Sequence, residues 1–365
     1  MKILHILNEL KFSGAELMLH AAANDLRQQA DHTILITGDQ PGEFAPALAA
    51  RGFALEHIPF RRNFAFLLAV YRLLRRADVD LIHVHTEQAS FWYGLLAHIA
   101  GKPNLRTLHS EFGFNGLLRW RRLLQRRLLA WLGTVFVACS PRVARNEQIR
   151  FGTQPRVVQN WFDPSRIHLA DAATRQEARQ KLGIDAAVFM ALCVGNNSAV
   201  KNFPAVIEAL RLCPAAADIA CTFCGDYDPA QQPTADDPIR ARVHFPGAVS
   251  NIGDWLAAAD AYICASHYEG GPLALLEAGA AGIFCISTRV GLVETLPALP
   301  NLIIVQPDAA SIAAALQQAQ RLPLTTRQEQ GAVLSAFMLE HFSPKRGARD
   351  YAAIYRELAQ KIKRL

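Results

Sequence analysis

The stretch AYICASHYEGGPLALLEA, residues 261–278, joins an apolar run to a glycine-rich loop and then to a helical pattern. A buried strand followed by a loop and a helix is typical of a βαβ unit in a parallel sheet. Pro272 suits the first position of a helix, so Gly271 to Leu273 are expected to direct free backbone N–H groups and the positive end of the helix dipole toward the loop. A helix start of this kind binds phosphate groups.

The same alternation extends outward over the whole chain. It runs from KILHILN at 2–8 to RVVQN at 156–160, with helices expected between the strands, among them 15–29 and 62–77, and it starts again from VFMALCVG at 188–195 to LIIVQ at 302–306. Repeated βαβ units predict an α/β protein with two Rossmann-like, doubly wound domains that face each other across a cleft. We expect the domains to span 1–165 and 166–345, with a closing helix at 346–365 that packs back on the first.

Length and composition fit this organisation. The 365 residues are 51% hydrophobic and 19% charged, which indicates an ordinary globular protein with two domains. No apolar stretch reaches the roughly 18 residues of a spanning helix, and no signal-peptide pattern follows Met1, so we expect a cytoplasmic protein. The seven cysteines lie mostly inside apolar runs and indicate buried thiols rather than disulfides.

Positive charge is concentrated in the first half of the chain. Residues 1–165 hold 20 Lys and Arg against 13 Asp and Glu, whereas the remainder holds 18 against 19. Residues 117–132, LLRWRRLLQRRLLAWL, combine arginines with leucines and tryptophans, which fits a helix on an anionic membrane surface, at the inner face of the inner membrane. The alternative is a helix whose leucines pack on the core and whose arginines are solvated. No nucleic-acid-binding motif accompanies the charge.

Two carboxylates flank the expected phosphate site. Glu269 precedes the helix and Glu277 lies on its second turn. Carboxylates accept hydrogen bonds from sugar hydroxyls, which is the functional interpretation. The alternative is that Glu269 caps the helix and that Glu277 is a solvated helical residue.

The segment 266–278 resembles the E-x7-E region of retaining glycosyltransferases of family 4, which have the GT-B fold. The resemblance covers nearly the whole chain, because further stretches resemble motifs of that family in the same order. They are FSGAE at 12–16, TLH at 107–109, QNWFD at 159–163, VG at 194–195 with KN at 201–202, FCGD at 223–226, VHFPG at 243–247 and VGLVE at 290–294.

This resemblance implies an enzyme that moves a sugar from a nucleotide diphosphate donor to a glycan or lipid-linked acceptor of an envelope polysaccharide or lipopolysaccharide. It implies neither a metal nor another cofactor. The first domain would lie on the acceptor side and the second would bind the nucleotide sugar. The donor's own β-phosphate would take the acceptor proton, because no pair of carboxylates can be assigned as nucleophile and acid.

The resemblance also implies roles for individual residues. Glu277 would bind the ribose, Glu269 the hydroxyls of the transferred sugar, and Lys201 the diphosphate, whose charge grows as it departs. The further donor contacts would be Gly14, Gly270, Gly271, Pro272 and Leu273 through the backbone, and His109 beside the sugar at the end of its strand.

One position departs from the family pattern. An arginine that commonly pairs with the lysine on the diphosphate is replaced by Asn196, which can donate a hydrogen bond but carries no charge. Either another basic group, such as Arg289, takes its place, or turnover is slower. The departure also motivates a non-catalytic binding subunit as an alternative function, besides a sugar-nucleotide epimerase.

Several patterns are compatible with a metal. His83 and His85 share a face of one strand and could hold an ion, or could be hydrogen-bonded residues near a strand end. Asp226-Tyr227-Asp228 resembles an Asp-x-Asp metal motif, and also the turn that family 4 has at this point. Cys221 and Cys224 lack a second pair of ligands. We expect a turn and no metal.

Overall fold

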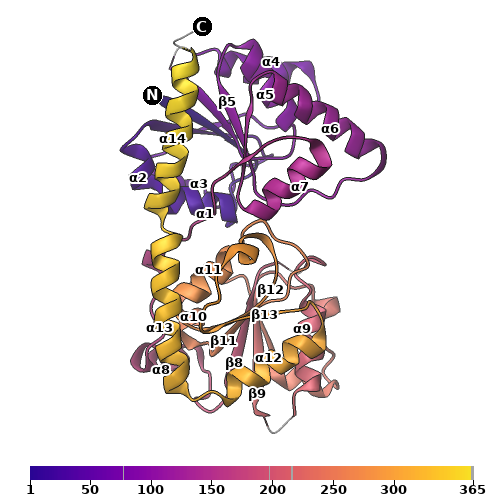
Figure 1. Cartoon of the computed structure of the whole chain (residues 1–365), viewed down its shortest axis with the longest axis vertical. Helices are drawn as coiled ribbons and strands as arrows, with labels where there is room; N and C mark the ends of the chain where they lie inside the picture. Colours follow the sequence, from indigo (N-terminus) through magenta and orange to yellow (C-terminus); the bar gives the residue numbers. More distant parts are fainter. Residues whose placement is uncertain (77, 197, 215–216, 363–365) are drawn as a thin grey trace. The chain divides into compact units, whose positions relative to one another are not determined.

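The structure is a computed structural model that describes residues 1–76, 78–196, 198–214 and 217–362. The chain forms two compact α/β units (Figure 1). The first consists of Met1–Phe162 together with Pro344–Leu365, and the second of Asp163–Ser343. Each unit is built on one parallel sheet, of seven strands in the first and six in the second, as in the GT-B fold.

The sheet of the first unit has the order β3-β2-β1-β4-β5-β6-β7, so the strand order reverses between β1 and β4. Its strands are β1 (Lys2–Leu7), β2 (Asp31–Ile36), β3 (Ala54–His57), β4 (Leu81–Val84), β5 (Asn104–Leu108), β6 (Val135–Ala138) and β7 (Arg156–Val157). Its helices are α1 (Gly14–Ala21), α2 (Ala23–Arg27), α3 (Ala45–Ala50), α4 (Phe64–Leu74), α5 (Ser90–Ile99), α6 (Gly116–Trp131), α7 (Pro141–Phe151) and α14 (Pro344–Ile362).

The two faces of this sheet differ in chemistry. Strand side chains alternate between faces, so Leu4 and Ile6 point to one side while His5 points to the other. The first side is apolar and packs against α4 and α5. The second side carries a group of buried histidines, which lie near Tyr351 and Tyr355 of α14.

Helix α14 is attached to the first unit by close contacts. A Cβ on Gly347 would lie 2.0 Å from the ring of Trp161, so only glycine allows the helix to approach this closely. Arg346 donates a hydrogen bond of 2.7 Å to the carbonyl of Gln159. Figure 1 shows α14 (yellow) running beside α2.

The sheet of the second unit has the order β10-β9-β8-β11-β12-β13 and reverses between β8 and β11. Its strands are β8 (Phe189–Val194), β9 (Ile219–Cys224), β10 (Val243–Gly247), β11 (Ala261–Cys264), β12 (Phe284–Thr288) and β13 (Leu302–Val305). Its helices are α8 (Ala172–Leu182), α9 (Phe203–Leu212), α10 (Ile252–Ala258), α11 (Leu273–Ala280), α12 (Ala309–Arg321) and α13 (Leu324–His341).

A buried aspartate connects three elements of the second unit. Asp260 precedes β11 and accepts hydrogen bonds from Arg179 of α8 at 2.5 Å and from the backbone N–H of Met190 on β8 at 2.9 Å. Arg175 of α8 and Arg327 of α13 lie 2.9 and 3.3 Å from its other oxygen. Three guanidinium groups therefore converge on one carboxylate.

The structure differs from the sequence predictions in several elements. The predicted helix at 15–29 is divided into α1 and α2 at Ala22. The indole N–H of Trp161 donates to the carbonyl of Met18, which also accepts the N–H of Ala22, and an inserted donor of this kind bends a helix. The predicted helices at 62–77 and 346–365 end in residues 77 and 363–365, which lie outside the described residues.

Candidate active site

The polar side chains predicted in the second unit meet at its topological switch point, where open α/β sheets bind ligands. Lys201 lies in the loop between β8 and α9, and Glu269 in the loop between β11 and α11. Their Nζ and Oε1 atoms are 2.7 Å apart. Ser266 donates a hydrogen bond of 2.9 Å to the same oxygen of Glu269. The switch point therefore carries a fixed ammonium–carboxylate pair.

Hydrogen bonds hold these two loops together. The backbone N–H of His267 donates to the carbonyl of Val200 at 2.9 Å. Asn202 donates from its side chain to the carbonyls of Ala265 and Pro307, at 3.3 and 3.0 Å. Lys201 lies between two anchored residues, so its position is set by the backbone as well as by Glu269.

Glycines allow the chain segments at this edge to approach one another. Gly225, after β9, has a φ of +136°, and a Cβ there would lie 2.0 Å from the carbonyl oxygen of Gly195 after β8. A Cβ on Gly291 would lie 2.4 Å from the carbonyl oxygen of Gly270. A side chain at Gly225 would therefore displace the loop after β8, which carries Lys201, and a side chain at Gly291 would displace the loop that carries Glu269.

The charge state of Lys201 depends on its carboxylate partner. Burial is the largest influence on the pKa of Lys201 and lowers it, but the Glu269 carboxylate and the Cys264 and Cys193 thiols together raise it above its usual range. The ammonium therefore stays charged at neutral pH. A charged donor at a strand end is suited to an anionic ligand.

Glu277 is buried on α11, which excludes the alternative of a solvated helical residue. Its side chain is only 7% exposed. Burial raises the pKa of the Glu277 carboxyl to about 7, while nearby Arg166 acts to lower it and Asp163 to raise it. Glu277 is thus a carboxyl group whose charge changes near neutral pH.

The start of α11 differs slightly from the prediction. The helix begins at Leu273, and Pro272 lies at the preceding N-cap position rather than at the first helical position. Its φ of −69° and ψ of 97° are extended, so Pro272 ends the loop instead of opening the helix. Gly270 and Pro272 are buried, whereas Gly271 and Leu273 are half-buried.

The position of the absent arginine is exposed. Asn196 follows β8 by two residues, and its carbonyl accepts the N–H of Ser198 at 2.9 Å. Arg289, the suggested replacement, is exposed directly after β12. Both residues therefore lie at the carboxyl ends of strands in the same sheet.

In the first unit, the predicted residues lie at the carboxyl ends of strands on both sides of its switch point. Gly14 is the first residue of α1, after β1, and Ser13 beside it donates a hydrogen bond to Glu16. His109 follows β5 directly and is half-buried. A pocket opens nearby at the ends of β1, β2 and β3. It is lined by Asn8, Glu9, Thr37, Gly38, Asp39, Phe60, Arg61, Arg62 and Gln88.

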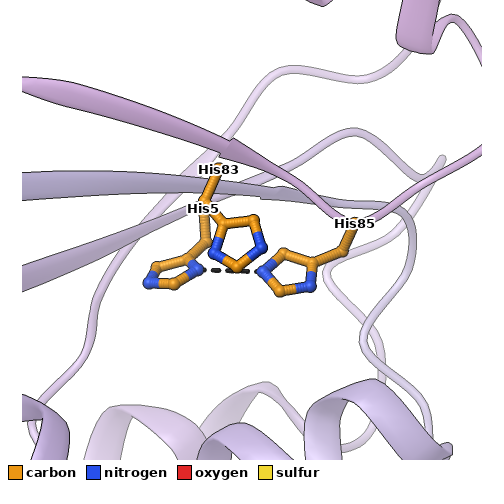
Figure 2. Close-up of side chains that lie close together, drawn as sticks. All are labelled: His5, His83 and His85. Carbon is orange, nitrogen blue, oxygen red and sulfur yellow. Dashed lines mark hydrogen bonds between the residues drawn. The ribbon is translucent and has the colours of Figure 1, made fainter. Parts of the chain in front are cut away.

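His109 is the end of a chain of hydrogen-bonded imidazoles that sequence reasoning missed. His32 Nε2 lies 3.2 Å from the carbonyl of Leu26, and His32 Nδ1 lies 2.8 Å from His5 Nε2. His5 Nδ1 lies 3.0 Å from His85 Nε2, which Figure 2 shows as a dashed line. His85 Nδ1 lies 3.1 Å from His109 Nε2. Four rings thus connect strands β2, β1, β4 and β5.

The trio His5, His83 and His85 has the residue types of a metal site, but its rings are arranged for hydrogen bonding. His83 stacks on His85 with 3.8 Å between ring centroids, so their lone pairs do not converge on one point. The nitrogens of His83 lie 2.8 Å from the hydroxyl of Tyr355 and 2.7 Å from that of Thr107. An ion would have to break these bonds. Among the described residues, this is the only group of three or more potential ligands.

The other metal patterns have structural explanations. Asp228 accepts the backbone N–H of Ala230 at 2.9 Å and caps a short 3-10 helix at Pro229–Gln231, so its carboxylate has a structural partner. Cys221 and Cys224 are buried free thiols on β9.

Helix α6 exposes its apolar residues instead of burying them. A stripe at helical spacing faces solvent, with exposed fractions of 88% at Leu117, 62% at Trp120, 66% at Leu124 and 81% at Trp131. The inward side carries Arg126, which is 1% exposed and pairs with Glu147 at 2.9 Å. The alternative, in which leucines pack on the core and arginines are solvated, is therefore wrong for most of the leucines, although Leu129 is buried. It holds for the three exposed arginines, Arg119, Arg121 and Arg127.

The described part of the chain contains no helix that is both long enough and apolar enough to cross a membrane.

The fold and the charged switch point of the second unit define a class, the glycosyltransferases with two Rossmann-like units. Residues 12–166 match the family model described as Glycosyltransferase Family 4, and residues 174–331 match the one described as Glycosyl transferases group 1. The chain belongs to this family, glycosyltransferase family 4, and is a glycosyltransferase.

Relatives agree with this assignment, and a solved structure agrees with the fold. The chain is 24% identical to the UDP-Gal:alpha-D-GlcNAc-diphosphoundecaprenol alpha-1,3-galactosyltransferase of Escherichia coli over 64% of each protein. It is 25% identical to the lipopolysaccharide core biosynthesis mannosyltransferase LpsB of Rhizobium meliloti, over 66% of this chain and 68% of LpsB. The crystal structure of Anabaena Alr3699/HepE in complex with UDP and glucose is 20% identical, with a TM-score of 0.83 over 98% of this chain and 100% of that chain.

Proposed function

We propose that this glycosyltransferase moves a sugar, with retention of configuration and without a metal, from a nucleoside diphosphate donor to a lipid-linked acceptor of an envelope glycan. The observation that carries the proposal is the Lys201–Glu269 pair at the switch point of the second unit, with Glu277 buried on the adjoining helix. Names of relatives support UDP as the nucleotide, since the E. coli enzyme uses UDP-Gal and HepE is described with UDP.

The second unit offers matching chemistry for each part of such a donor. Lys201 neutralises the diphosphate, and the backbone N–H groups of Gly270, Gly271 and Leu273 donate to it at the start of α11. Glu269 accepts hydrogen bonds from sugar hydroxyls and Glu277 from the ribose. Gly14, Asn196 and His109 are proposed as further donor contacts, and Arg289 as the basic group that replaces the absent arginine.

The transfer step itself uses the donor's phosphate. The acceptor hydroxyl bonds to the anomeric carbon as the bond from that carbon to the β-phosphate oxygen breaks, and the acceptor proton passes to the departing phosphate. Lys201 stabilises the charge that accumulates there. No divalent cation is needed, because an ammonium and helix N–H groups supply the positive potential.

The acceptor side of the proposal rests on the first unit. The polar pocket at the ends of β1, β2 and β3 contains Arg61, which pairs with Asp39 at 2.6 Å, and Arg62, whose charge suits a phosphate-linked acceptor. The exposed stripe of α6 is flanked by the exposed Arg121 and Arg127, so apolar and basic groups occur together as in interfacial helices. We propose that α6 contacts an anionic lipid surface that carries the acceptor.

Calorimetric titration with UDP, GDP, ADP and dTDP tests the donor site. We expect UDP to bind equally well with and without EDTA, and Lys201→Ala and Glu277→Ala each to weaken binding by about tenfold or more, as the loss of a charged or buried contact predicts. Glu340→Ala, an exposed change on α13, serves as the control. The proposal is wrong if no diphosphate binds, and its metal independence is wrong if EDTA abolishes binding.

A further inference from the structure

The imidazole chain of the first unit has a direction that its hydrogen bonds determine. Its far end is the carbonyl oxygen of Leu26, which can only accept, so His32 must donate from Nε2. A neutral imidazole has one N–H, which leaves His32 Nδ1 as an acceptor. His5 must therefore donate to it from Nε2.

The donor and acceptor roles of the remaining rings, from His5 to His109, are determined in the same way. His5 Nδ1 is left as an acceptor, so His85 donates to it from Nε2. His85 Nδ1 is then an acceptor, and His109 donates to it from Nε2. All four rings carry their proton on Nε2, and His109 ends the chain with a lone pair on Nδ1.

The four imidazole rings are neutral because of their environment. Burial lowers the pKa of His32 and of His109 to about 4. Burial also lowers the pKa of His5 and of His85 well below the usual value, and neighbouring histidines lower both further. At neutral pH each ring therefore has a single N–H.

We propose that His32, His5 and His85 are positioning residues that hold His109 in its Nε2–H tautomer, so that Nδ1 accepts a hydrogen bond from a sugar hydroxyl. The sugar contact rests on the proposed function, whereas the tautomer does not. The chain orients His109 and does not conduct protons, because the Leu26 carbonyl at its far end cannot take one up.

Nitrogen-15 NMR of the full chain, labelled at histidine, tests the tautomer without any ligand. In the wild type we expect His109 to show a protonated Nε2 and an unprotonated Nδ1. In His85→Leu the acceptor is lost and both tautomers of His109 should appear. In His85→Asn the side-chain oxygen can replace Nδ1 as acceptor, so the wild-type tautomer should return. His98→Asn, exposed on α5, is the control for assignment.

Titration with UDP, UDP-glucose, UDP-galactose and UDP-N-acetylglucosamine gives the second readout. We expect His85→Leu to weaken binding of the preferred UDP-sugar by about tenfold and to leave binding of UDP unchanged, since one hydrogen bond to the sugar is lost. His85→Asn should restore most of the affinity.

Three outcomes would overturn the proposal or its positioning role. A proton on His109 Nδ1 in the wild type overturns the proposal, and so does a His85→Leu protein that keeps the wild-type tautomer. Equal weakening of UDP and UDP-sugar in His85→Leu overturns the positioning role, because it indicates general damage. If no UDP compound binds the wild type, UDP is not the donor nucleotide, while the NMR spectra still decide the tautomer.

Discussion

At the scale of single residues, Glu277 combines burial with a charge that changes near neutral pH. A carboxyl whose pKa is higher in the folded protein than in the unfolded chain is destabilising once the unfolded chain ionises. The usual value is 4.5 and the folded value about 7, so stability is lost as the pH rises from about 4.5 to about 7 and stays low above that.

Glu277→Gln removes this titration. We expect the variant to exceed the wild type in unfolding free energy at pH 8 by up to about 3 kcal/mol, since one pKa unit corresponds to about 1.4 kcal/mol. The gain should disappear at pH 4, where the Glu277 carboxyl is largely neutral in both the folded and the unfolded protein. Denaturant unfolding at both pH values measures it, with Glu340→Gln as control. A gain independent of pH contradicts the assigned cause.

The same substitution should weaken nucleotide binding, because an amide is a poorer acceptor for hydroxyl groups than a carboxylate. A Glu277→Gln variant that is more stable but binds UDP less tightly would show that the carboxylate serves ligand binding and not the stability of the fold. Calorimetry at pH 8 measures this, and unchanged affinity for UDP would mean that Glu277 does not contact the ligand.

At the scale of elements, Asp260 connects α8, α13 and β8. Asp260→Asn leaves three guanidinium groups around a neutral amide, and loss of one partner of a buried pair typically costs about 3–5 kcal/mol. We expect a decrease of this size in unfolding free energy. Asp254→Asn breaks the exposed pair with Lys181 and should cost less than about 1 kcal/mol. Similar losses in the two variants would show that the Asp260 cluster is no stronger than a surface pair.

Much of the fold was predictable because local patterns determine it. Apolar runs predicted the strands, and the loop from Ser266 to Pro272 predicted where α11 starts. The division of α1 and α2 was not predictable, because it depends on Trp161, which is more than a hundred residues away in sequence. Likewise, the orientation of α6 depends on the ion pair of Arg126 with Glu147 and on its stacking over Phe151, tertiary contacts that leave most of the leucines exposed.

The candidate site was predictable to a similar degree. The order of the family 4 motifs along the chain indicated Lys201 and Glu269 as site residues. In the structure their side chains form an ion pair. The imidazole chain was missed because its members come from four strands, and period-two patterns show which residues share a face of one strand but not the register between strands. The histidines at alternate positions 83 and 85 were the sequence pattern that could have indicated the imidazole chain.

At the scale of the whole molecule, the charge asymmetry of the chain and the stripe of α6 predict association with membranes. We expect the protein to co-sediment with vesicles containing phosphatidylglycerol at low salt and to dissociate as salt is added. Trp120→Ser with Trp131→Ser should reduce binding by about tenfold, since two large apolar side chains are lost. Trp92→Ser, an exposed tryptophan on α5, is the control. Unchanged binding in the double variant would exclude α6 as the contact.

The return of α14 to the first unit has a consequence for biosynthesis. Residues 344–362 leave the ribosome only after the whole second unit has been made, so the nascent first unit remains incomplete during that time. Until Tyr351 and Tyr355 have been synthesised, the histidine face and the apolar surface around Trp161 lack their cover, and this apolar surface is a target for chaperones. A stop codon before residue 344 would therefore damage the unit that was synthesised first.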